Sequence, residues 1–398
     1  MSLLREEGIF SYIVANKWMR ANYGQPMRKW LKEQRIDEII DFGDLPVFQK
    51  ATTYPCIIRI TKSHPWSSFE VTQVKTLDFQ NLNDYVKENH YSVNQSSLDD
   101  RGWSLSDERT QALLGKINSK GAPLREYVGG KIYYGIKTGL NEAFVVNAQT
   151  RERLITEDPK SAEIIKPFLA GRDIKRYEQP KSDKYLIFTR HGVIINDYPA
   201  IKQYLGQFKD KLTPKPKDWT GEEWKGRKPG AYKWYEIQDT IDYYAEFEKP
   251  KIIIPAIVQT ASYAFDRSSI YSNDKTSIIP TDDLYLLGIL NSKAADFVLH
   301  SISSTKQGGY FEYKPMYVQQ IPIRAIDFSD PADVAYHDRI ISLVEQMLSL
   351  NKRFQEVHTP EDKTALQRQI EVTDEHIDQI AYELYGLTKD EIKIVESI

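Results

Sequence analysis

The chain has 398 residues, of which 41% are hydrophobic and 27% charged, as expected of an ordinary globular protein with two or three compact units. Its longest apolar run, at residues 252–258, is far below the roughly 20 residues that cross a bilayer, which excludes a membrane-spanning helix. A single cysteine, Cys56, excludes an internal disulfide and a cysteine metal cluster, and it favours a reducing, cytoplasmic compartment.

The net charge of −3 hides an uneven distribution. Residues 327–398 hold 16 acidic and 7 basic side chains. Two upstream segments are basic, residues 166–190 with 7 basic and 3 acidic side chains and residues 205–233 with 8 and 4. If these cations cluster in space they favour a phosphate-rich partner, and if they disperse they form a solvated surface; the sequence leaves both interpretations open.

The first 80 residues predict the closing section of an open α/β sheet. Hydrophobic periodicity and a proline near a helix start predict a strand at 8–16, a helix at 24–35, and strands at 36–43, 54–62 and 69–77. One helix and a few strands leave a sheet face and an edge uncovered. We therefore expect an earlier part of a longer chain, or a partner, to complete the sheet.

The rest of the chain changes pattern twice. Residues 81–125 are polar and turn-rich and predict a connector, with one short helix that Ser106 or Asp107 caps. Residues 126–326 alternate short aromatic and β-branched runs with Gly, Pro and Asp, which predicts a mixed, β-rich domain. Residues 327–398 take a helical period and predict an antiparallel helical pair that ends at Gly386.

No self-sufficient catalytic motif is present. The sequence has no glycine-rich phosphate loop, no HExxH and no G-x-S-x-G, and its seven histidines lack metal-ligand spacing. Neither a catalytic residue nor a metal site is therefore predicted in this chain.

Several segments together resemble a known family. Residues 8–60 read GIFSYIVANKWMRANYGQPMRKWLKEQRIDEIIDFGDLPVFQKATTYPCIIRI and resemble the end of the catalytic domain of type IIG restriction-modification enzymes, which are adenine-N6 DNA methyltransferases fused to nucleases. Four later segments resemble the TaqI-like target-recognition region that follows this domain in the family. They are GGKIYYGIKTGLNEAFVVN, IIKPFLAGRDIKRY, GYFEYKPMYVQQIPI and IAYELYGLTKDEIKIVE. The similarity extends over essentially the whole chain.

The resemblance implies a fold that is α/β and α+β. Residues 1–80 would be the C-terminal portion of a Rossmann-like methyltransferase sheet, 81–125 a connector, 126–326 the DNA target-recognition domain and 327–398 the helical pair. It implies S-adenosylmethionine as cofactor and Mg²⁺ for the nuclease of the parent enzyme. The family's cofactor-binding glycine motif is absent from this sequence. Its Asn-Pro-Pro-Tyr loop is absent as well, since no two prolines are consecutive. We therefore expect no cofactor and no activity in this chain alone, and as partners double-stranded DNA and the missing N-terminal part of the parent, but no membrane.

The resemblance also assigns a role to Phe48. By position this ring matches the aromatic residue that stacks on the extruded adenine in the family, and an aromatic face restores roughly 1–3 kcal/mol of lost base stacking. The alternative is that Phe48 is a core residue beside Val47. Tyr54, which also flanks the loop, is a weaker substitute.

Side chains that suit base edges and phosphates lie in several loops. A glycine-flanked turn, which is otherwise an ordinary hairpin, contains Lys137, Thr138 and Asn141. A loop whose tryptophans we interpret as anchors contains Lys215, Lys217, Lys225, Arg227 and Lys228. Beside a Gly pair lie Lys306 and Gln307. Three further cations, which are equally well explained as structural salt bridges, are Arg172, Lys175 and Arg176.

The leading hypothesis is a DNA-recognition and adenine-positioning part of a type IIG enzyme, in which the acidic helical pair orients the recognition domain without touching phosphate. A stand-alone specificity subunit of the type I kind is an alternative, although such a subunit would not begin with methyltransferase strands. A methylation-only phage-defence methyltransferase and a protein-interaction module are further alternatives; the last predicts that the basic segments lie on opposite faces.

Overall fold

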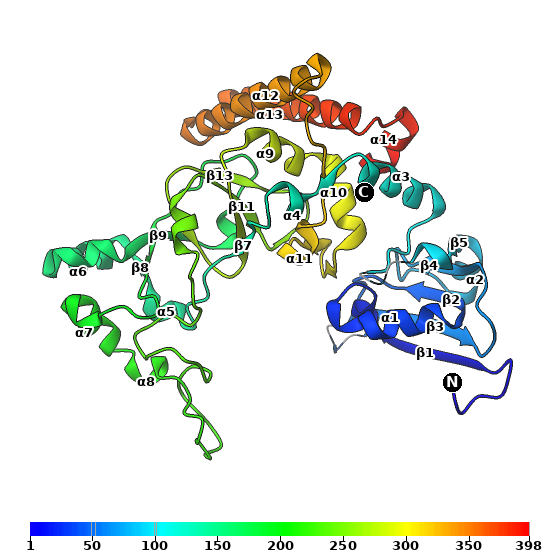
Figure 1. Ribbon diagram of the computed structural model, residues 1–398, viewed down its shortest axis with the longest axis horizontal. Helices are drawn as coiled ribbons and strands as arrows, with labels where there is room; N and C mark the ends of the chain where they lie inside the picture. The colour runs from blue at the N-terminus through cyan, green and yellow to red at the C-terminus, as the bar shows by residue number, and fades with distance from the viewer. Residues whose placement is uncertain (49, 52, 99, 101, 398) are drawn as a thin grey trace.

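The computed structural model describes residues 1–48, 50–51, 53–98, 100 and 102–397. Figure 1 shows an arched molecule with the N-terminal strands at one end and, at the other, α5 (Asn141–Phe144), α7 (Pro199–Gly206) and α8 (Lys209–Leu212). A central body of sheets and helices lies between these ends, and a pair of long helices covers its convex side. None of the described helices combines the length and the apolar character that a membrane crossing needs.

The N-terminal sheet comprises five strands in the order β1-β3-β2-β4-β5. Its elements are β1 (Ile9–Ala15), α1 (Gln25–Lys32), β2 (Arg35–Asp41), β3 (Pro55–Thr61), β4 (Ser68–Gln73), α2 (Leu82–Asn89) and β5 (Tyr91–Asn94). Strand β3 is antiparallel to both β1 and β2, so β1 and β2 run parallel and are joined through α1. Strand β2 also pairs in parallel with β4.

The core of this sheet forms where apolar residues alternate. Cys56, Ile58 and Ile60 occupy every second position of β3 and are buried, as period-2 alternation requires. Trp103 lies in the same core, with its ring edge-on to Trp18 at a centroid distance of 5.2 Å. Helix α2 and strand β5 are not predicted from the sequence. Both are short and polar, and β5 is a strand because it pairs with β4.

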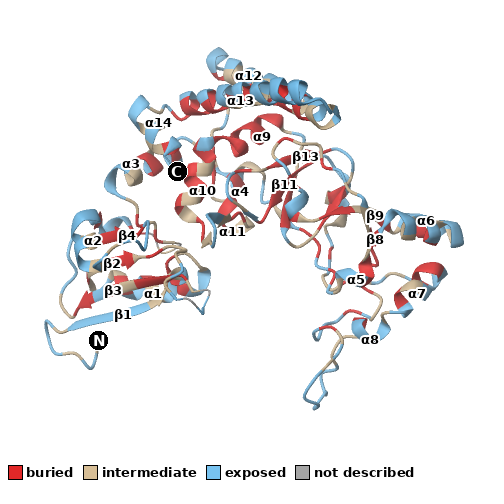
Figure 2. Cartoon of the chain, turned by 180° about the vertical axis from the view of Figure 1, so that it is seen from behind, coloured by how far each residue is buried: buried red, intermediate tan, exposed pale blue. Residues whose placement is uncertain are grey.

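Strand β1 is an edge strand that is exposed on both faces. Ile9 and Tyr12 are 62% and 60% exposed, and their neighbours Phe10 and Ile13 are also exposed. Figure 2 shows the strand in the exposed colour along most of its length. Successive side chains of a strand point to opposite faces. Apolar side chains on both faces of β1 are therefore in contact with solvent.

The central body contains four smaller sheets, in the orders β14-β9-β10-β8, β13-β11-β15-β7, β12-β17-β16 and β18-β6. Their strands are β6 (Ala122–Pro123), β7 (Tyr133–Tyr134), β8 (Val145–Asn147), β9 (Ile165–Leu169), β10 (Lys184–Ile187), β11 (Lys251–Pro255), β12 (Ile257–Val258), β13 (Ala264–Asp266), β14 (Tyr271–Ser272), β15 (Thr276–Pro280), β16 (Thr305–Lys306), β17 (Tyr310–Glu312) and β18 (Pro322–Ile323). The helices are α3 (Glu108–Ser119), α4 (Leu124–Tyr127), α6 (Ala148–Glu157), α9 (Leu284–Asn291), α10 (Lys293–Ile302) and α11 (Pro315–Val318), besides α5, α7 and α8. The fold is thus mixed α/β with several small sheets.

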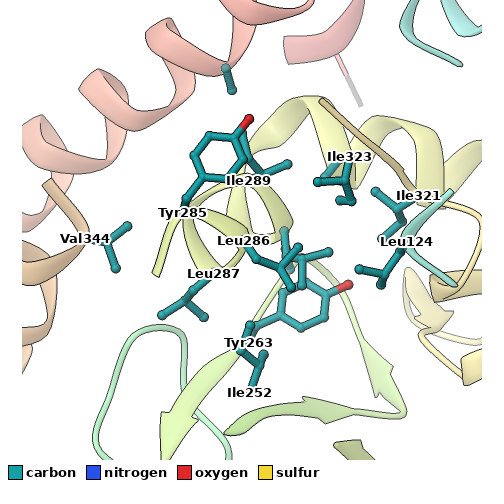
Figure 3. Packing of buried hydrophobic residues seen from close by; sticks show 14 of the residues in the cluster. Leu124, Ile252, Tyr263, Tyr285, Leu286, Leu287, Ile289, Ile321, Ile323 and Val344 are labelled. Carbon is teal, nitrogen blue, oxygen red and sulfur yellow. The ribbon is translucent and has the colours of Figure 1, made fainter. Parts of the chain in front are cut away.

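Helix α9 is the centre of the largest core. All eight of its residues are buried, and a helix that is hydrophobic all round belongs inside a protein. Figure 3 shows Leu286 and Leu287 directed toward the β11 side, where Ile252 and Tyr263 lie. On its other side α9 contacts the first long helix near Val344.

The C-terminal segment forms the predicted helical pair. Helices α12 (Pro331–Glu356) and α13 (Pro360–Leu384) are joined by a short turn and pack along each other. Gly386 follows with a φ of +66°, which favours glycine at a helix end. A further helix, α14 (Lys389–Glu396), then packs against α10.

Gly288 permits the close approach of α9 to α12. A Cβ at this position would lie 2.6 Å from Cγ2 of Ile340 and 3.0 Å from Cγ2 of Val344. Both neighbours are β-branched and stiff in a helix. We expect Gly288→Ala to destabilise the chain by about 1–3 kcal/mol through overpacking. The midpoint of urea unfolding measures this.

The matched control is Gly115→Ala in α3, where an added Cβ meets nothing within 4 Å. There the higher helix propensity of alanine should stabilise by about 0.5–1 kcal/mol. Equal effects of the two substitutions would contradict the packing explanation.

Candidate nucleic-acid interface

Phe48 is displayed on the surface. It lies in the loop of residues 42–54, which follows the carboxyl end of β2 and leads into β3, and its side chain is 43% exposed. The neighbouring Val47 instead packs against the small core around Ile40 and Phe42. Of the two interpretations open for Phe48, the structure therefore excludes a fully buried core residue and leaves the ring accessible to a base.

Tyr54 has a different environment at the far end of the same loop. Its ring is 7% exposed, and its hydroxyl accepts a hydrogen bond from the backbone N–H of Gln307 at 2.9 Å. A buried ring cannot stack on a nucleotide. The structure thus leaves Phe48 as the accessible ring of the two.

The three candidate DNA contacts in the turn at residues 137–141 differ in exposure. Lys137 and Asn141 are exposed, whereas Thr138 is 2% exposed and donates its hydroxyl hydrogen to Oδ1 of Asn141 at 2.7 Å. The expectation that Thr138 contacts DNA is corrected by this burial. Its side chain orients the Asn141 amide instead.

Asn141 lies in a surface pocket of about 470 Å³. Its polar lining comes from Asn141, Asn147, Arg172, Lys184 and Asn273, over an apolar floor that includes Phe168. Asn141 and Arg172 were predicted from the sequence. The other three were not, because they lie on or directly after separate strands that only the order β14-β9-β10-β8 brings together. Amides and cations of this kind suit base edges and phosphates.

Arg227 is an internal anchor of the basic loop. It is 4% exposed and donates to five backbone carbonyls, those of Thr138, Leu212, Lys233, Trp234 and Glu236. Burial lowers the pKa of its guanidinium to about 10. The expectation that Arg227 contacts DNA is therefore corrected, since its donors are all directed into the protein.

The other cations of this loop face solvent. Lys217, Lys225 and Lys228 are exposed and Lys215 is half-buried. Trp224 donates its indole N–H to the carbonyl of Thr213 at 3.1 Å and anchors the loop, whereas Trp219 of the same loop is 41% exposed.

The remaining candidates differ in how far their charge is already paired. Arg176 forms an ion pair with Asp374 of α13 and donates to the carbonyl of Asn291 at 2.5 Å, so it is a structural salt bridge. Lys306 pairs with Glu312 at 2.7 Å, which neutralises it locally. The exposed side chains of this group are Arg172, Lys175 and Gln307. No set of His, Cys, Asp or Glu suited to a metal ion occurs among the described residues.

Comparison with known families tests the resemblance. Residues 166–323 match the TaqI-like C-terminal specificity domain, and residues 1–48 match the Eco57I restriction-modification methylase. The family resemblance is confirmed. Residues 166–323 are thus similar to a TaqI-like specificity domain, and we refer to them as the specificity domain.

Relatives of known function extend over the same region. The type II methyltransferase M.BstVI of Geobacillus stearothermophilus is 22% identical and is matched over 100% of this chain and 67% of its own length. The type II restriction enzyme and methyltransferase RM.Eco57I of Escherichia coli is 23% identical over 100% of this chain and 43% of its own length. The chain thus spans between 43% and 67% of the length of these relatives.

A solved structure shares the fold. The type IIL restriction-modification enzyme MmeI, whose structure was determined in complex with DNA, superposes with a TM-score of 0.60. The match covers 98% of this chain and 50% of that chain at 13% identity. This similarity extends across the N-terminal sheet, the central body and the helical pair.

The contacts of Arg227 generate a stability prediction. Arg227→Met should remove five hydrogen bonds to backbone carbonyls, of which, among the described residues, only those of Thr138 and Lys233 also accept from a backbone N–H, and we expect a loss of about 3 kcal/mol or more. Urea unfolding followed by tryptophan fluorescence measures it. The neighbouring Lys228→Met, at an exposed position, should change stability by less than about 0.5 kcal/mol. Similar midpoints for both variants would contradict the anchoring role.

Proposed function

We propose that this chain recognises the target sequence and positions the target adenine in a type IIG restriction enzyme or a related adenine-N6 DNA methyltransferase. The observation that carries the proposal is the combination, in one chain, of a TaqI-like specificity domain with a methylase-matching N-terminal segment that displays Phe48. S-adenosylmethionine is then the cofactor of the complete enzyme, and Mg²⁺ that of its nuclease where one is present.

The sheet topology supports a methyltransferase remnant. Strands β1 and β2 are parallel and joined by α1, and ligands of open α/β sheets bind outside the carboxyl ends of such strands. The Phe48 loop begins at the carboxyl end of β2. The edge strand β1, with Ile9, Phe10, Tyr12 and Ile13 exposed, supports the further proposal that the rest of the methyltransferase sheet covers it.

The candidate DNA contacts are those that the structure leaves exposed. They comprise Lys137, Asn141, Arg172, Lys175, Lys217, Lys225, Lys228 and Gln307, with the half-buried Lys215. The DNA complex of MmeI, a protein of the same fold, supports duplex DNA as the partner. The methylase match of residues 1–48 favours this proposal over a stand-alone specificity subunit.

DNA binding by the chain tests the proposal. If about six cations contact phosphates, affinity for a duplex should fall about a thousandfold between about 50 and 200 mM salt through counterion release. Fluorescence anisotropy over a salt series measures the slope of log affinity against log salt. Absent or salt-insensitive binding would overturn the proposal.

Single substitutions sharpen this measurement. Lys217→Ala and Lys225→Ala should each lower the salt slope by about 1. The control is Lys363→Ala on α13, an exposed lysine of the acidic helical pair, which should leave the slope unchanged.

Phe48 tests base positioning separately from DNA binding. In the complete enzyme, Phe48→Ala should slow methyl transfer by about 10- to 100-fold, because loss of one base–aromatic stack is worth about 1–3 kcal/mol. Affinity for DNA should change much less. The matched control is Phe328→Ala, since Phe328 is 70% exposed on a different segment. Equal losses of affinity and rate for Phe48→Ala would indicate a packing role.

A further inference from the structure

A glycine-tipped hairpin of the specificity domain reaches the N-terminal sheet. We define residues 303–312 as the junction hairpin: β16 pairs with β17 in the register Lys306↔Tyr310, and Gly308 and Gly309 turn with φ values of +85° and +73°. Glu312 binds both Lys306 at 2.7 Å and Lys314 at 2.9 Å. The hairpin is joined to its own domain by β12, which pairs with β17 in the register Ile257↔Glu312 and Val258↔Phe311.

The same hairpin holds both ends of the loop that carries Phe48. The N–H of Gln307 donates to the Tyr54 hydroxyl at 2.9 Å, and the N–H of Gly309 donates to Oδ2 of Asp44 at 3.3 Å. Asp44 and Tyr54 lie on opposite sides of Phe48 in the sequence. A third contact joins the guanidinium of Arg20 to the Ser303 carbonyl at 2.6 Å.

These contacts limit how far the hairpin tip can lie from the Phe48 ring. Four residue steps lead from Asp44 to Phe48, and a chain spans at most about 3.5 Å per step, so the Cα atoms of these two residues lie within about 14 Å of each other. With about 3.4 Å per base pair, this distance corresponds to about four base pairs of duplex. A base that stacks on Phe48 thus brings its own base pair close to the tip.

The tip carries groups that suit an unpaired base. The side chains of Gln307 and Tyr310 are exposed, and the Gln307 amide makes no hydrogen bond among the described residues. A glutamine amide offers both a carbonyl acceptor and N–H donors. Thymine that has lost its adenine presents a complementary N–H donor and carbonyl acceptor.

Given the proposed function, we propose that the junction hairpin contacts DNA at the target base pair, with Gln307 directed to the base that remains in the helix. Tyr54 and Asp44 are positioning residues: they hold the tip beside Phe48 before DNA binds. This pre-organisation fixes the register between the recognised sequence and the base that is extruded.

Site-directed DNA cleavage tests the placement. Cys56, the single native cysteine, is completely buried, and burial raises the pKa of its thiol to about 12, so an introduced cysteine is labelled selectively. Gln307→Cys, Phe48→Cys and Lys225→Cys variants each carry an iron–EDTA label. The probe is the duplex that the unmodified chain enriches from a random-sequence pool.

We expect the cleavage centres from positions 307 and 48 to lie within about four base pairs of each other, and the centre from position 225 to lie apart from both. Suppose that a duplex is enriched but the cleavage centres from positions 307 and 48 lie farther apart, or that the label at position 307 gives no localised cleavage. Either result would overturn this inference alone. Failure to enrich any duplex would overturn the proposed function and this inference with it.

Tyr54→Phe tests the positioning role, since it removes only the hydroxyl that accepts from Gln307. We expect DNA affinity within about threefold of the unmodified chain, but a broadened cleavage pattern from position 307. The control is Tyr12→Phe on β1, an exposed tyrosine, which should leave the pattern unchanged. Lower thermal stability with an unchanged cleavage pattern would show a purely structural role and overturn the assignment of Tyr54.

Discussion

The wholly buried helix α9 is the constraint on which the rest of the molecule depends. It packs the central β-strands on one side and the long helix α12 on the other, so neither layer can move independently. Gly288 lets the backbone of α9 approach Ile340 so closely that even a Cβ would force the packing to shift. The helical pair is thereby fixed to the specificity domain, and the ion pair of Arg176 with Asp374 adds a second attachment.

Basic residues in this chain have two separate uses. The guanidinium groups of Arg227 and Arg176 bind carbonyls and a carboxylate of the protein itself. The loops that they hold present exposed lysines to solvent. A guanidinium has five donors in a rigid fork, which suits it to bridge several carbonyls, whereas the single charge of a lysine is readily carried at the surface. Local basic composition therefore overstates the number of side chains that are available to phosphate.

Local patterns predicted much of the fold, because they act within a few residues. The strand–helix–strand order of residues 9–41, the cap of α3 by Asp107 and the helical pair all follow from periodicity and caps. Strand β5 could not be predicted from the sequence, because its pairing with β4, and not its own composition, makes it a strand.

The candidate site was harder to predict from sequence than the fold. Tyr54 and Gln307 are 253 residues apart, and no local pattern relates them. The pocket around Asn141 likewise draws Asn147, Lys184 and Asn273 from three different strands or strand ends. The burial of Thr138 and Arg227 could not be inferred either, since a glycine-flanked turn and a lysine-rich loop are both typical of surfaces.

Under the proposed function, the charge distribution and the arch would together orient a duplex. The helical pair, whose segment holds 16 acidic and 7 basic residues, lies on the convex side, while the N-terminal sheet and the segment around α8 extend away from it. Phosphates of such a duplex would be repelled from the acidic side and attracted to exposed lysines of the loop that follows α8. A duplex that approaches from the side opposite the helical pair would meet the specificity domain and the Phe48 loop together. Because the junction hairpin already joins these two parts, contact with one places the other without a separate docking step.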